Sequence, residues 1–496
     1  MSASRLKPAE REFFEAMAHV VYGNPFSAQR AEVIARLAPA ATPGRSFEDP
    51  GALVRVVAPR LEPYLRAGSA DLEGLSAADR RSLEPAFMYV CYHRVIPQFD
   101  ALIERQALKA GDALPVAFAE EAVGDLMRSG LDETRALRYF ALFFQLRRGF
   151  YFIQRSLAGD CESMQRLREA LWNNIFTHDM RGFEAALWSR MEDFSTLLLG
   201  ETGTGKGAVA AAIGRSAFIP YVVERRRFAA NFTETFIAIN LSQFSETLIE
   251  SELFGHHKGA FTGAIDHHEG VFERCNTHGA LFLDEIGEVA IPVQIKLLQV
   301  LQERTFAAVG GREKKRFEGR VIAATNQPLG VLRREGRFRD DFFYRLCSDV
   351  IEMPTLRQRI AESSAELEQL VRRLVARIAG AEVPELVAAV LEALDADLPR
   401  GYAWPGNVRE LEQAVRRILL TGRYTGDIPG APADDDDRMV EALRAGTLTA
   451  DALLSRYCGL LYRRLGTYAE VAKRTGLDPR TARKYVESAK SEPDRA

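Results

Sequence analysis

The sequence predicts an α/β protein: a parallel sheet covered by helices and completed by a helical lid, with a mainly helical region before it and a short helical region after it. Three observations support this fold class. The 496 residues exceed one ordinary domain, because domains commonly span about 100–200 residues. From about residue 195, short aliphatic runs alternate with helical stretches, as in a parallel sheet whose strands are connected by helices. On either side of that part, apolar residues recur at spacings of three and four.

The overall composition is that of a soluble globular protein, with 47% apolar and 27% charged residues, which excludes a wholly disordered or collagen-like chain. The net charge is −3, so any contact with nucleic acid must come from a local basic patch. The five cysteines are scattered and form no CxxC pair, which indicates a reducing compartment. Because neither a secretory signal nor an apolar window of about 18 residues occurs, we expect a cytoplasmic protein without a membrane partner.

The first part of the chain, residues 1–174, is expected to form a mainly helical domain. Pro8–Val21 and Leu137–Leu157 carry apolar residues at helical spacing. Glycines and prolines cluster at 39–51, which predicts a loop between helical groups. The sequence of this part matches no common sensor type, so it is assigned a general role in sensing a signal or restraining the remainder.

Five short runs predict the strands of the sheet, in a domain that spans 175–355. Their aliphatic and β-branched composition suits strands that helices cover on both faces. The runs are Thr196–Leu199, Phe236–Ile239, Leu281–Leu283, Val321–Ala324 and Asp349–Ile351.

The remainder of the chain divides at a polar segment. From Ala361 to Leu420 the pattern is helical again, which predicts a helical lid over 356–424. Glycine, proline and four consecutive aspartates, Asp434–Asp437, indicate an acidic linker at 425–437. The last domain, 438–496, is short and helical.

A glycine-rich loop follows the first predicted strand and precedes a helical run at Ala208–Ile213. Glycines let backbone N–H groups turn toward phosphate oxygens, and the helix N-terminus adds positive potential. Lys206 is placed to reach the β and γ phosphates of a nucleotide. A plain tight turn is the alternative, but the strand, the lysine and the helix together favour nucleotide binding. The candidate phosphate-binding residues are Gly200, Glu201, Thr202, Gly203, Thr204, Gly205, Lys206 and Gly207.

Two carboxylates end the third predicted strand, in the run Gly279-Ala-Leu-Phe-Leu-Asp284-Glu285. Ligands of open α/β sheets bind at the carboxyl ends of the strands, so Asp284 is a candidate Mg²⁺ ligand. Glu285 is a candidate to orient or deprotonate an attacking water. A helix start with acidic residues is the alternative, and the apolar run before the acids argues against it. Because Gly207 lacks the hydroxyl that usually follows a P-loop lysine, the metal must be held from elsewhere.

The segment Glu250–Ala264 reads ESELFGHHKGAFTGA and ends in a glycine-bounded hexapeptide. Together with the P-loop, it resembles the AAA+ ATPase module of bacterial sigma-54-dependent transcription activators, over about residues 195–424. The glycines permit hinge motion and Phe261 supplies an apolar anchor, whereas periodicity alone would suggest only a surface loop. The resemblance implies that the contacts with sigma-54 in the RNA polymerase holoenzyme are Gly259, Ala260, Phe261, Thr262, Gly263 and Ala264.

The resemblance also implies roles for residues around the nucleotide. Asn240 matches a residue that switches the catalytic glutamate between states, and Asn326 matches the sensor of the γ phosphate. Arg409, in the run Trp404-Pro-Gly-Asn-Val-Arg409, matches the second sensor in the lid. Arg339 and Arg345 match the arginine-finger segment, which would reach the nucleotide of a neighbouring subunit. The sequence does not rank these two arginines, and surface ion pairs remain their alternative.

Two features near these motifs need separate interpretation. Gly207 stands where the family usually has an acidic residue, and since the family works without a hydroxyl there, we expect hydrolysis to survive. The histidine pairs His256-His257 and His267-His268 flank the hexapeptide. Adjacent pairs without nearby cysteines favour support of the loop base over a metal site.

The segment from Thr467 to Glu487 predicts a helix, a turn and a second helix. Gly476 suits the turn, Asp478 can cap the second helix, and Pro479 suits its first position. A charged oligomerisation tail is the alternative, but the position after an activator-type ATPase module favours double-stranded DNA at an upstream activating site. The candidate DNA contacts in the major groove are Arg480, Thr481, Arg483 and Lys484.

The combined prediction is a transcription activator that forms a ring, expected to be a hexamer. It would hydrolyse ATP with Mg²⁺ to remodel the sigma-54 RNA polymerase holoenzyme while its last domain holds upstream DNA. Two rival functions stay open. One is an AAA+ remodeller of another protein target, and the other is a non-hydrolysing, nucleotide-gated DNA-binding switch, which the residue Gly207 suggests.

Overall fold

The computed structural model describes residues 6–39, 51–66, 69–70, 72, 75–424, 426, 443 and 448–491. The chain divides into two compact units, Met1–Arg423 and Tyr424–Ala496. Most of the loop predicted at 39–51 and the acidic run Asp434–Asp437 lie outside the described residues. Within the described part of the chain, no helix is both long enough and apolar enough to cross a membrane.

The first unit begins with helices, as the periodicity of residues 1–174 predicts. The elements are α1 (Pro8–Tyr22), α2 (Ala28–Leu37), α3 (Gly51–Leu61), β1 (Leu65–Arg66), β2 (Ser69–Ala70), α4 (Ala77–Ala107), α5 (Ala119–Arg128), α6 (Glu133–Ser156), α7 (Glu162–Phe176) and α8 (Met180–Gly182). Ser27, Ser76 and Asp132 each accept a hydrogen bond from the backbone N–H three residues ahead, at the starts of α2, α4 and α6. These caps satisfy N–H groups that the helix itself leaves without a partner.

A five-stranded parallel sheet forms the centre of the unit, and all five strands predicted from the sequence are present. They are β3 (Thr196–Leu199), β6 (Phe236–Asn240), β7 (Ala280–Asp284), β10 (Arg320–Thr325) and β11 (Asp349–Glu352). The strands lie in the order β11-β3-β10-β7-β6, and every pairing is parallel. The register sets Leu199 beside Thr325 and Asn240 beside Asp284, so these residues lie at the carboxyl edge of the sheet.

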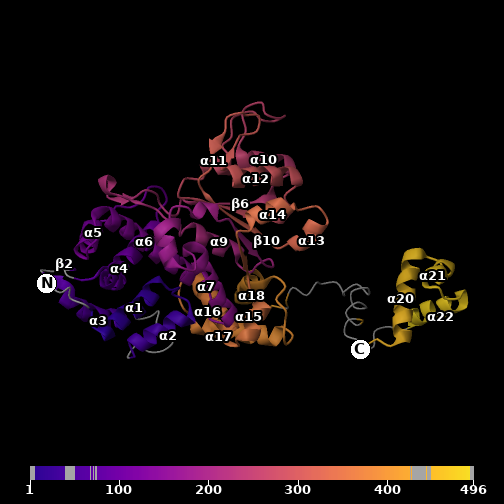
Figure 1. Ribbon diagram of the computed structural model, residues 1–496. Coiled ribbons are helices and arrows are strands. Elements are labelled where there is room, and N and C mark those ends of the chain that lie inside the picture. Colours follow the sequence, from indigo (N-terminus) through magenta and orange to yellow (C-terminus); the bar gives the residue numbers. More distant parts are fainter. Residues whose placement is uncertain are drawn as a thin grey trace. The chain divides into compact units, whose positions relative to one another are not determined.

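Helices cover both faces of this sheet (Figure 1). They are α9 (Lys206–Gly214), α10 (Glu246–Phe254), α11 (Val271–Arg274), α12 (Ile291–Glu303), α13 (Leu329–Arg334) and α14 (Asp340–Leu346). Successive side chains of a strand point to opposite faces, so neighbours enter different cores. Leu198 and Phe282 pack in the core that contains α9, whereas Leu197 and Leu281 pack in the core that contains α10 and α12.

The core on the α9 face continues into the N-terminal helices. Phe99 of α4 and Leu198 of the sheet belong to the same apolar cluster, and both α6 and α7 pack on α9. The fully buried guanidinium of Arg148 in α6 donates hydrogen bonds to the carbonyls of Arg215 and Ala217, at 2.6 and 2.7 Å. The helical region and the sheet therefore fold against one shared interior.

The predicted lid is a bundle of four helices. These are α15 (Leu356–Glu362), α16 (Ala365–Ala379), α17 (Pro384–Asp397) and α18 (Asn407–Thr421). Three short antiparallel pairs lie outside the main sheet in the described part of the chain: β1 with β2, β4 (Tyr221–Val222) with β5 (Arg227–Phe228), and β8 (Thr305–Phe306) with β9 (Lys315–Arg316). The short helical turns are η1 (Glu62–Tyr64), η2 (Phe183–Leu187), η3 (Met191–Asp193), η4 (Val223–Arg225), η5 (Leu241–Gln243) and η6 (Ile286–Glu288).

The described residues of the second unit form three packed helices, α20 (Ala450–Leu465), α21 (Tyr468–Thr475) and α22 (Pro479–Ser491). Gly476 ends α21 in a left-handed conformation, with φ of 73°. Asp478 Oδ1 accepts hydrogen bonds from the N–H groups of Arg480 and Thr481, so it caps α22 as predicted. Val471 and Val486 are fully buried between the helices. The helix, turn and helix arrangement predicted for this segment is confirmed.

Candidate nucleotide site and projecting loop

The glycine-rich loop connects β3 to α9, at the carboxyl edge of the sheet. Gly203 and Gly205 have φ of 81° and 99°, a region that favours glycine. A Cβ atom added to Gly203 would lie 2.1 Å from the carbonyl oxygen of Gly406, which precedes α18, so the lid leaves no room for a side chain there. Lys206 begins α9, and its Nζ donates hydrogen bonds to the carbonyls of Gly200 at 2.8 Å and Glu201 at 3.2 Å. The loop therefore closes around the ammonium group.

The charge of Lys206 depends on two opposing influences. Burial lowers the pKa of its ammonium group, whereas the nearby carboxylates of Glu285 and Asp284 raise it. The side chain is thus a buried cation that faces the two acids at the end of β7. A cation enclosed in this way suits the binding of phosphate oxygens.

The two predicted acids end β7 in an uncommon backbone conformation. Glu285 has φ of 57°, in the left-handed region that non-glycine residues seldom adopt, and its N–H donates to Asp284 Oδ1 at 3.1 Å. The backbone N–H of Asn326, which follows β10, lies 3.4 Å from Glu285 Oε2. Strained conformations of this kind gather at functional sites.

The two predicted asparagines lie on either side of these acids. The Asn326 amide donates from Nδ2 to Thr202 Oγ1 at 2.9 Å, so it connects the end of β10 to the glycine-rich loop. Asn240 pairs in register with Asp284, but its Oδ1 accepts hydrogen bonds from the N–H and the hydroxyl of Ser242. Asn240 therefore caps η5, the short helical turn that follows it.

The lid contacts the loop through residues that the sequence interpretation did not single out. Arg357 of α15 pairs with the carboxylate of Glu201, with one N–O distance of 2.8 Å. The hydrogen bond from Arg357 lowers the pKa of that carboxyl. Asn407, which is fully buried with φ of 52°, donates from Nδ2 to Glu201 Oε2 and to the Thr202 carbonyl, both at 3.1 Å. The sequence feature that could have identified Asn407 is its position directly after Gly406, because asparagine tolerates a left-handed φ at such a turn.

Arg409 lies on a helix of the lid, whereas the two predicted finger residues, Arg339 and Arg345, lie just before and within α14. Arg409 lies in the first turn of α18, with its Cβ 3.0 Å from a Cβ atom added to Gly203. Arg339, which precedes α14, pairs with the exposed Asp341, with Nη2–Oδ2 at 2.7 Å. Arg345 donates from Nε and Nη2 to the carbonyl of Leu301, at 3.0 and 2.7 Å.

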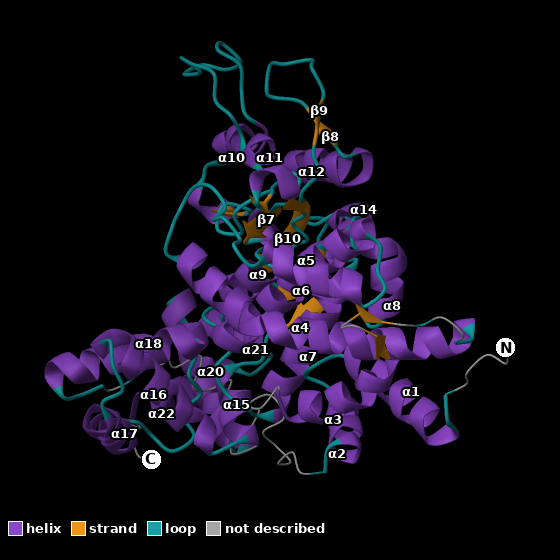
Figure 2. Cartoon of the chain, turned by 90° about the vertical axis from the view of Figure 1, so that its left-hand side faces the viewer, coloured by secondary structure: helices purple, strands orange, loops and turns teal. Residues whose placement is uncertain are grey.

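The hexapeptide Gly259–Ala264 forms the tip of a loop between α10 and α11. Gly259 and Gly263 have φ of 81° and 105°, and the N–H of Gly259 donates to the Ala264 carbonyl at 2.8 Å. Figure 2 shows this loop rising beside the loop that connects β8 and β9, at the same end of the unit. The two loops are joined at their base, because His257 N–H donates to the Val309 carbonyl at 3.1 Å.

The histidines at this base pack against the loop. His256 and His268 exchange two backbone hydrogen bonds of 3.0 Å, and the His256 ring lies edge-on to Phe261 with centroids 4.9 Å apart. His267 lies in a second group with Glu269 and Glu273, whose potential ligand atoms fall within 4.8 Å of one another. The first two of that group are exposed, and Glu273 pairs with Lys315.

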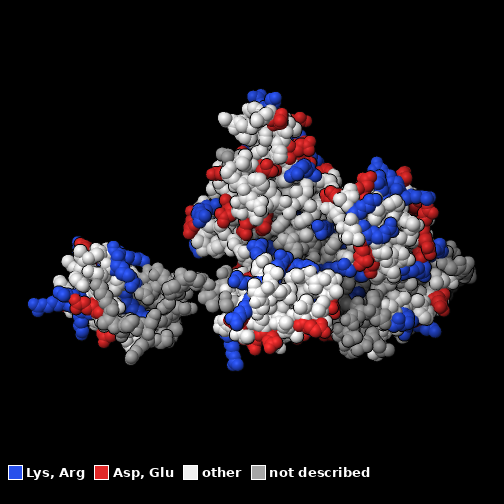
Figure 3. Space-filling model, turned by 180° about the vertical axis from the view of Figure 1, so that it is seen from behind, with Lys and Arg blue, Asp and Glu red and all other residues white. Residues whose placement is uncertain are grey.

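Basic side chains are prominent on the face of the second unit seen in Figure 3, where acidic and uncharged residues lie among them. Arg480, Arg483 and Lys484 of α22 are exposed. Arg483 pairs with Glu487 one turn later, at 2.7 Å, and the Thr481 hydroxyl donates to Asp478. The predicted DNA-contacting residues therefore lie on the first two turns of one helix.

Comparison with known proteins points to one family. Residues 180–352 match the family described as the sigma-54 interaction domain. The chain is 40% identical over 238 residues to the DNA-binding transcriptional regulator NtrC of Azospirillum brasilense, covering 48% of this chain and 45% of that protein. It is 32% identical to the regulatory protein AtoC of Escherichia coli, covering 67% of this chain and 72% of AtoC.

Other relatives extend the comparison. The Nif-specific regulatory protein of Azotobacter vinelandii is 36% identical, over 58% of this chain and 49% of that protein. The chain thus spans about half the length of NtrC and of this regulator. Among solved structures, NtrX from Brucella abortus in complex with ATP matches with a TM-score of 0.40 and 21% identity, over 75% of this chain and 80% of that one.

The match to AtoC and the sigma-54 interaction domain agree with the glycine-rich loop, the paired acids and the projecting hexapeptide. The chain belongs to the family of sigma-54-dependent transcriptional activators, with an AAA+ core.

Proposed function

We propose that this protein hydrolyses ATP to remodel the sigma-54 RNA polymerase holoenzyme, so that promoter DNA opens. One observation carries the proposal. The hexapeptide loop Gly259–Ala264 rises from the same unit in which the P-loop and the acids Asp284 and Glu285 meet at one sheet edge. A nucleotide site and a glycine-bounded loop on one core are the parts that such a motor needs.

The chemistry follows from the residues at the sheet edge. The backbone N–H groups of the loop and Lys206 bind the β and γ phosphates. Asp284 supplies the oxygen ligand that Mg²⁺ prefers, and the ion would neutralise phosphate charge. Glu285 accepts a proton from the attacking water, while the N–H of Asn326 fixes its second oxygen. Gly207 contributes no ligand, so Asp284 is the protein residue that we assign to the metal.

Three groups of residues would transmit a change in the bound nucleotide to the lid and to the projecting loop Gly259–Ala264. Asn326 connects Glu285 to the P-loop, Asn240 pairs in register with Asp284, and Asn407 connects the P-loop to α18, the lid helix that carries Arg409. Loss of the γ phosphate changes what these groups can bind, which shifts the elements that carry them. We propose that this motion raises or lowers Phe261 and Thr262 against sigma-54.

The active form is proposed to be a ring, with a hexamer as the expected size. Within the described part of the chain, the one ion-pair partner of Arg339 is the exposed carboxylate of Asp341, so Arg339 can leave it and stabilise charge on the nucleotide of the next subunit. Arg345 is held by a backbone carbonyl of α12 and would follow when α14 moves. The region 1–174 is proposed to regulate this ring, and the lid spans 356–424.

The first experiment separates an enzyme from a nucleotide-gated switch. Lys206→Ala should weaken ATP binding at least tenfold, whereas Glu285→Gln should bind ATP normally and lose about 100-fold or more in turnover. Steady-state phosphate release and fluorescent-nucleotide titration measure the two effects. Equal loss of ATP binding in both variants would contradict the assigned roles, and no turnover in the unmodified protein would favour the switch.

A second experiment tests the partner. Thr262→Ala should abolish retention of sigma-54 in the presence of a transition-state mimic of ATP, yet leave basal hydrolysis within about twofold. Thr421→Ala removes the same atoms from an exposed end of α18 and should retain sigma-54. If Thr262→Ala retains sigma-54 as well as Thr421→Ala does, the hexapeptide is not the contact and a different protein target becomes the better hypothesis.

The second unit is proposed to bind double-stranded DNA through α22. Arg480 and Lys484 are exposed on its first two turns, where a recognition helix meets base edges and phosphates. Arg480→Gln should weaken binding and reduce the slope of log affinity against log salt by about one. Arg456→Gln, on the exposed side of α20, is the matched control, and equal loss in both variants would indicate only a general charge effect.

A further inference from the structure

A cavity of about 490 Å³ lies at the end of the sheet opposite the nucleotide site. Its walls come from α6 and α7, from the connecting segment 188–193, from the end of α9, and from the starts of β7 and β10. Cavities of about 300–1,000 Å³ commonly hold small molecules. None of the residues assigned to ATP, sigma-54 or DNA lines it.

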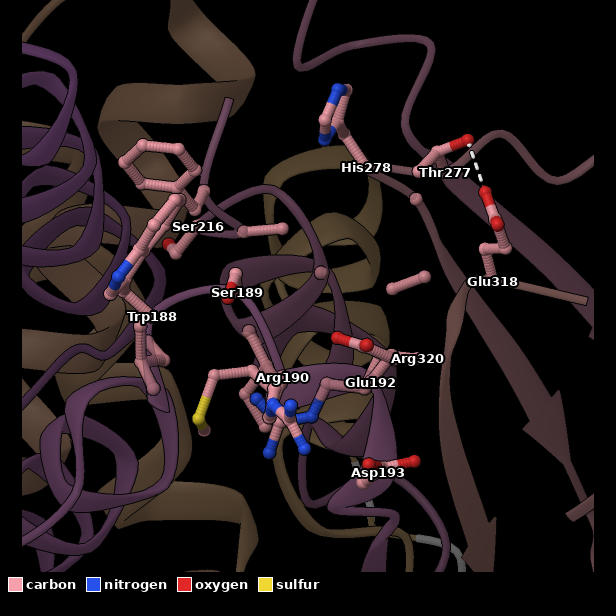
Figure 4. Close-up of a pocket in the computed structure, with 18 of the residues that line it drawn as sticks. Trp188, Ser189, Arg190, Glu192, Asp193, Ser216, Thr277, His278, Glu318 and Arg320 are labelled. Atoms are coloured by element: carbon pink, nitrogen blue, oxygen red, sulfur yellow. Dashed lines mark hydrogen bonds between the residues drawn. The ribbon is translucent and has the colours of Figure 1, made fainter. Parts of the chain in front are cut away.

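The cavity has a buried floor and an exposed rim. Ile213 and Phe317 of the floor are at most 2% exposed, whereas Ser189 and Arg190 of the rim are open to solvent. In Figure 4, Trp188 lies on one side of the pocket and His278 on the other, and Arg190 lies at the lower end of the view. A ligand can therefore enter from solvent and reach an apolar interior.

The apolar wall is rigid and aromatic. The rings of Trp188 and Phe218, which both line the cavity, pack edge to face with centroids 4.7 Å apart. Ile175 of α7 and Ile213 of α9 continue the same wall. Surfaces of this kind favour a planar or short aliphatic body over a fully polar ligand.

The polar wall carries a surplus of positive charge. Four arginines and three carboxylates line the cavity: Arg190, Arg304, Arg316, Arg320, Glu192, Asp193 and Glu318. Arg316 pairs with Glu318 and Arg304 pairs with Asp193, so these charges are balanced. Arg190 has no ion pair or side-chain hydrogen bond among the described residues.

Two buried arginines add to the positive charge near the polar wall. Arg320 is 8% exposed, and the hydrogen bonds it makes to described residues all go to uncharged oxygens, of Phe194, Asn174 and Thr196. The guanidinium of Arg148 donates hydrogen bonds to two backbone carbonyls and lies over the ring of Phe144, 4.4 Å from its centroid. Burial lowers the pKa of Arg320 to about 10 and that of Arg148 to about 9, which leaves both charged near neutral pH. Burial lowers the pKa of His278 as well, so this residue adds a neutral ring to the rim.

We propose that this cavity binds a small organic anion, with its carboxylate or phosphate group at Arg190 and its apolar body against Trp188. Charge attraction at Arg190 supplies orientation, and the aromatic wall supplies burial. The ligand would bridge the N-terminal helices and the sheet, and thereby report a metabolite to the motor.

The cavity also touches the far ends of two elements of the nucleotide site. Helix α9 begins at Lys206 and ends at Gly214, and β7 begins at Ala280 and ends at Asp284; Gly214 and Ala280 line the cavity. A ligand that holds these ends fixes the positions of the elements that carry the lysine and the acid. This coupling rests on the proposed function, whereas the binding itself does not.

Binding is tested on the full-length protein by ligand-detected NMR titration with benzoate and with phenyl phosphate. At least one of these anions should saturate, and benzyl alcohol, a neutral molecule of similar shape, should bind about tenfold more weakly or worse. The relative affinity of benzoate and phenyl phosphate identifies which anionic group the site prefers. Absence of saturable binding by both anions, or equal affinity for benzyl alcohol, would overturn the proposal.

Substitutions of Arg190 test whether the anion binds in this cavity. Arg190→Gln should weaken the anion at least fivefold, while Arg190→Lys, which keeps the charge, should stay within about threefold of the unmodified protein. Arg81→Gln, at an exposed arginine of α4 outside the cavity, is the matched control. Because Arg190 is exposed and has no partner among the described side chains, its substitution should leave the melting temperature unchanged. An unaltered affinity in Arg190→Gln would place the anion elsewhere.

Coupling is tested by repeating the titration with saturating ADP. If the cavity and the nucleotide site are linked, the anion affinity changes at least threefold, and the ADP affinity changes by the same factor when the anion is present. Binding without any change would remove the regulatory half of the proposal. Saturable binding in a protein that never hydrolyses ATP would instead contradict the proposed function and leave this site standing.

Discussion

Gly207, the second residue of α9, has an ordinary helical environment with space around it. A Cβ atom added there would lie 3.9 Å from the nearest atom, in the ring of Phe282. Gly207→Ala should therefore raise the free energy of unfolding by about 0.5–1 kcal/mol, because alanine restricts the unfolded chain more than glycine does. Urea denaturation measures this gain. Turnover should stay within about twofold, and a large loss would show that the nucleotide needs a bare backbone at this position.

Arg320 tests how a buried cation is stabilised when its direct hydrogen-bond partners are uncharged and the carboxylate of Asp349 acts on it without a hydrogen bond. Its guanidinium makes four hydrogen bonds to uncharged oxygens at 2.9 to 3.1 Å. Arg320→Met should destabilise the first unit by about 3 kcal/mol, because it removes the hydrogen bonds that Arg320 donates to the carbonyl oxygens of Asn174 and Phe194. Arg316→Met, at a side chain that is 77% exposed, should cost less than about 0.5 kcal/mol. Similar midpoints for the two variants in denaturant titrations would contradict this account.

At the scale of residues, the sequence identified the groups whose chemistry depends on local spacing. The glycine loop, Lys206 and the acids at the end of β7 occur in fixed short patterns, so their placement could be predicted. Arg357 and Asn407 could not, because their partner Glu201 lies 156 and 206 positions away in the chain. Only the packing of the lid on the loop brings them together.

At the scale of elements, α7 and the lid helix α15 are joined by a charged cap. Glu362 Oε2 accepts a hydrogen bond from the N–H of Ser163 at 2.8 Å, in the first turn of α7. Burial acts to raise the pKa of this carboxyl, but the hydrogen bonds from Ser163 outweigh it and lower the pKa to about 2. The ordinary value is 4.5, so the ionised form is the one that stabilises the fold.

The sign of this shift predicts a pH dependence. The stabilisation is complete above about pH 5 and is lost as the pH falls from 4.5 toward 2, because protonation of Glu362 then favours the unfolded chain. Glu362→Gln should cost about 0.5–1 kcal/mol at pH 7, a value reduced by solvent exposure, and progressively less at pH 4.5 and 3.5. Urea unfolding at the three pH values checks this. A cost that stays constant with pH would exclude a role for the charge.

The strands show which kinds of element can be predicted from the sequence. All five strands of the main sheet are aliphatic runs flanked by polar or turn residues, and each was located to within one residue at either end. The pairs β4 with β5 and β8 with β9 were not predicted, because two residues are too few to show a period of two.

At the scale of the whole molecule, a ring that shares its active sites makes a quantitative prediction. Arg339→Ala subunits retain an intact nucleotide site, and Glu285→Gln subunits retain an intact finger, so neither assembly should hydrolyse ATP well alone. An equal mixture should recover about a quarter of the original turnover, since half the sites are intact and half of those face an intact finger. Phosphate release after subunit exchange measures the recovery. No gain over the separate variants would mean that the finger acts within its own subunit.

The composition of the chain predicted a soluble, multidomain protein, but it gave no indication that the N-terminal helices would share their interior with the sheet. Phe99 and Leu198 are apolar at positions that local periodicity assigns to separate cores, and only the cluster that joins them shows otherwise. The predicted division at residue 174 therefore concerns function, because the two parts share one hydrophobic core.

That common interior sets a rule for exchanging sensory parts between relatives. A graft cut at residue 174 would strip α9 and one sheet face of their covering and expose Leu198 and Phe282 to water. A viable hybrid must transplant the partner surfaces together, including Arg148 and the carbonyls after α9 that it holds. Specificity for a new stimulus would thus be inherited as a matched pair of surfaces and not as a detachable module.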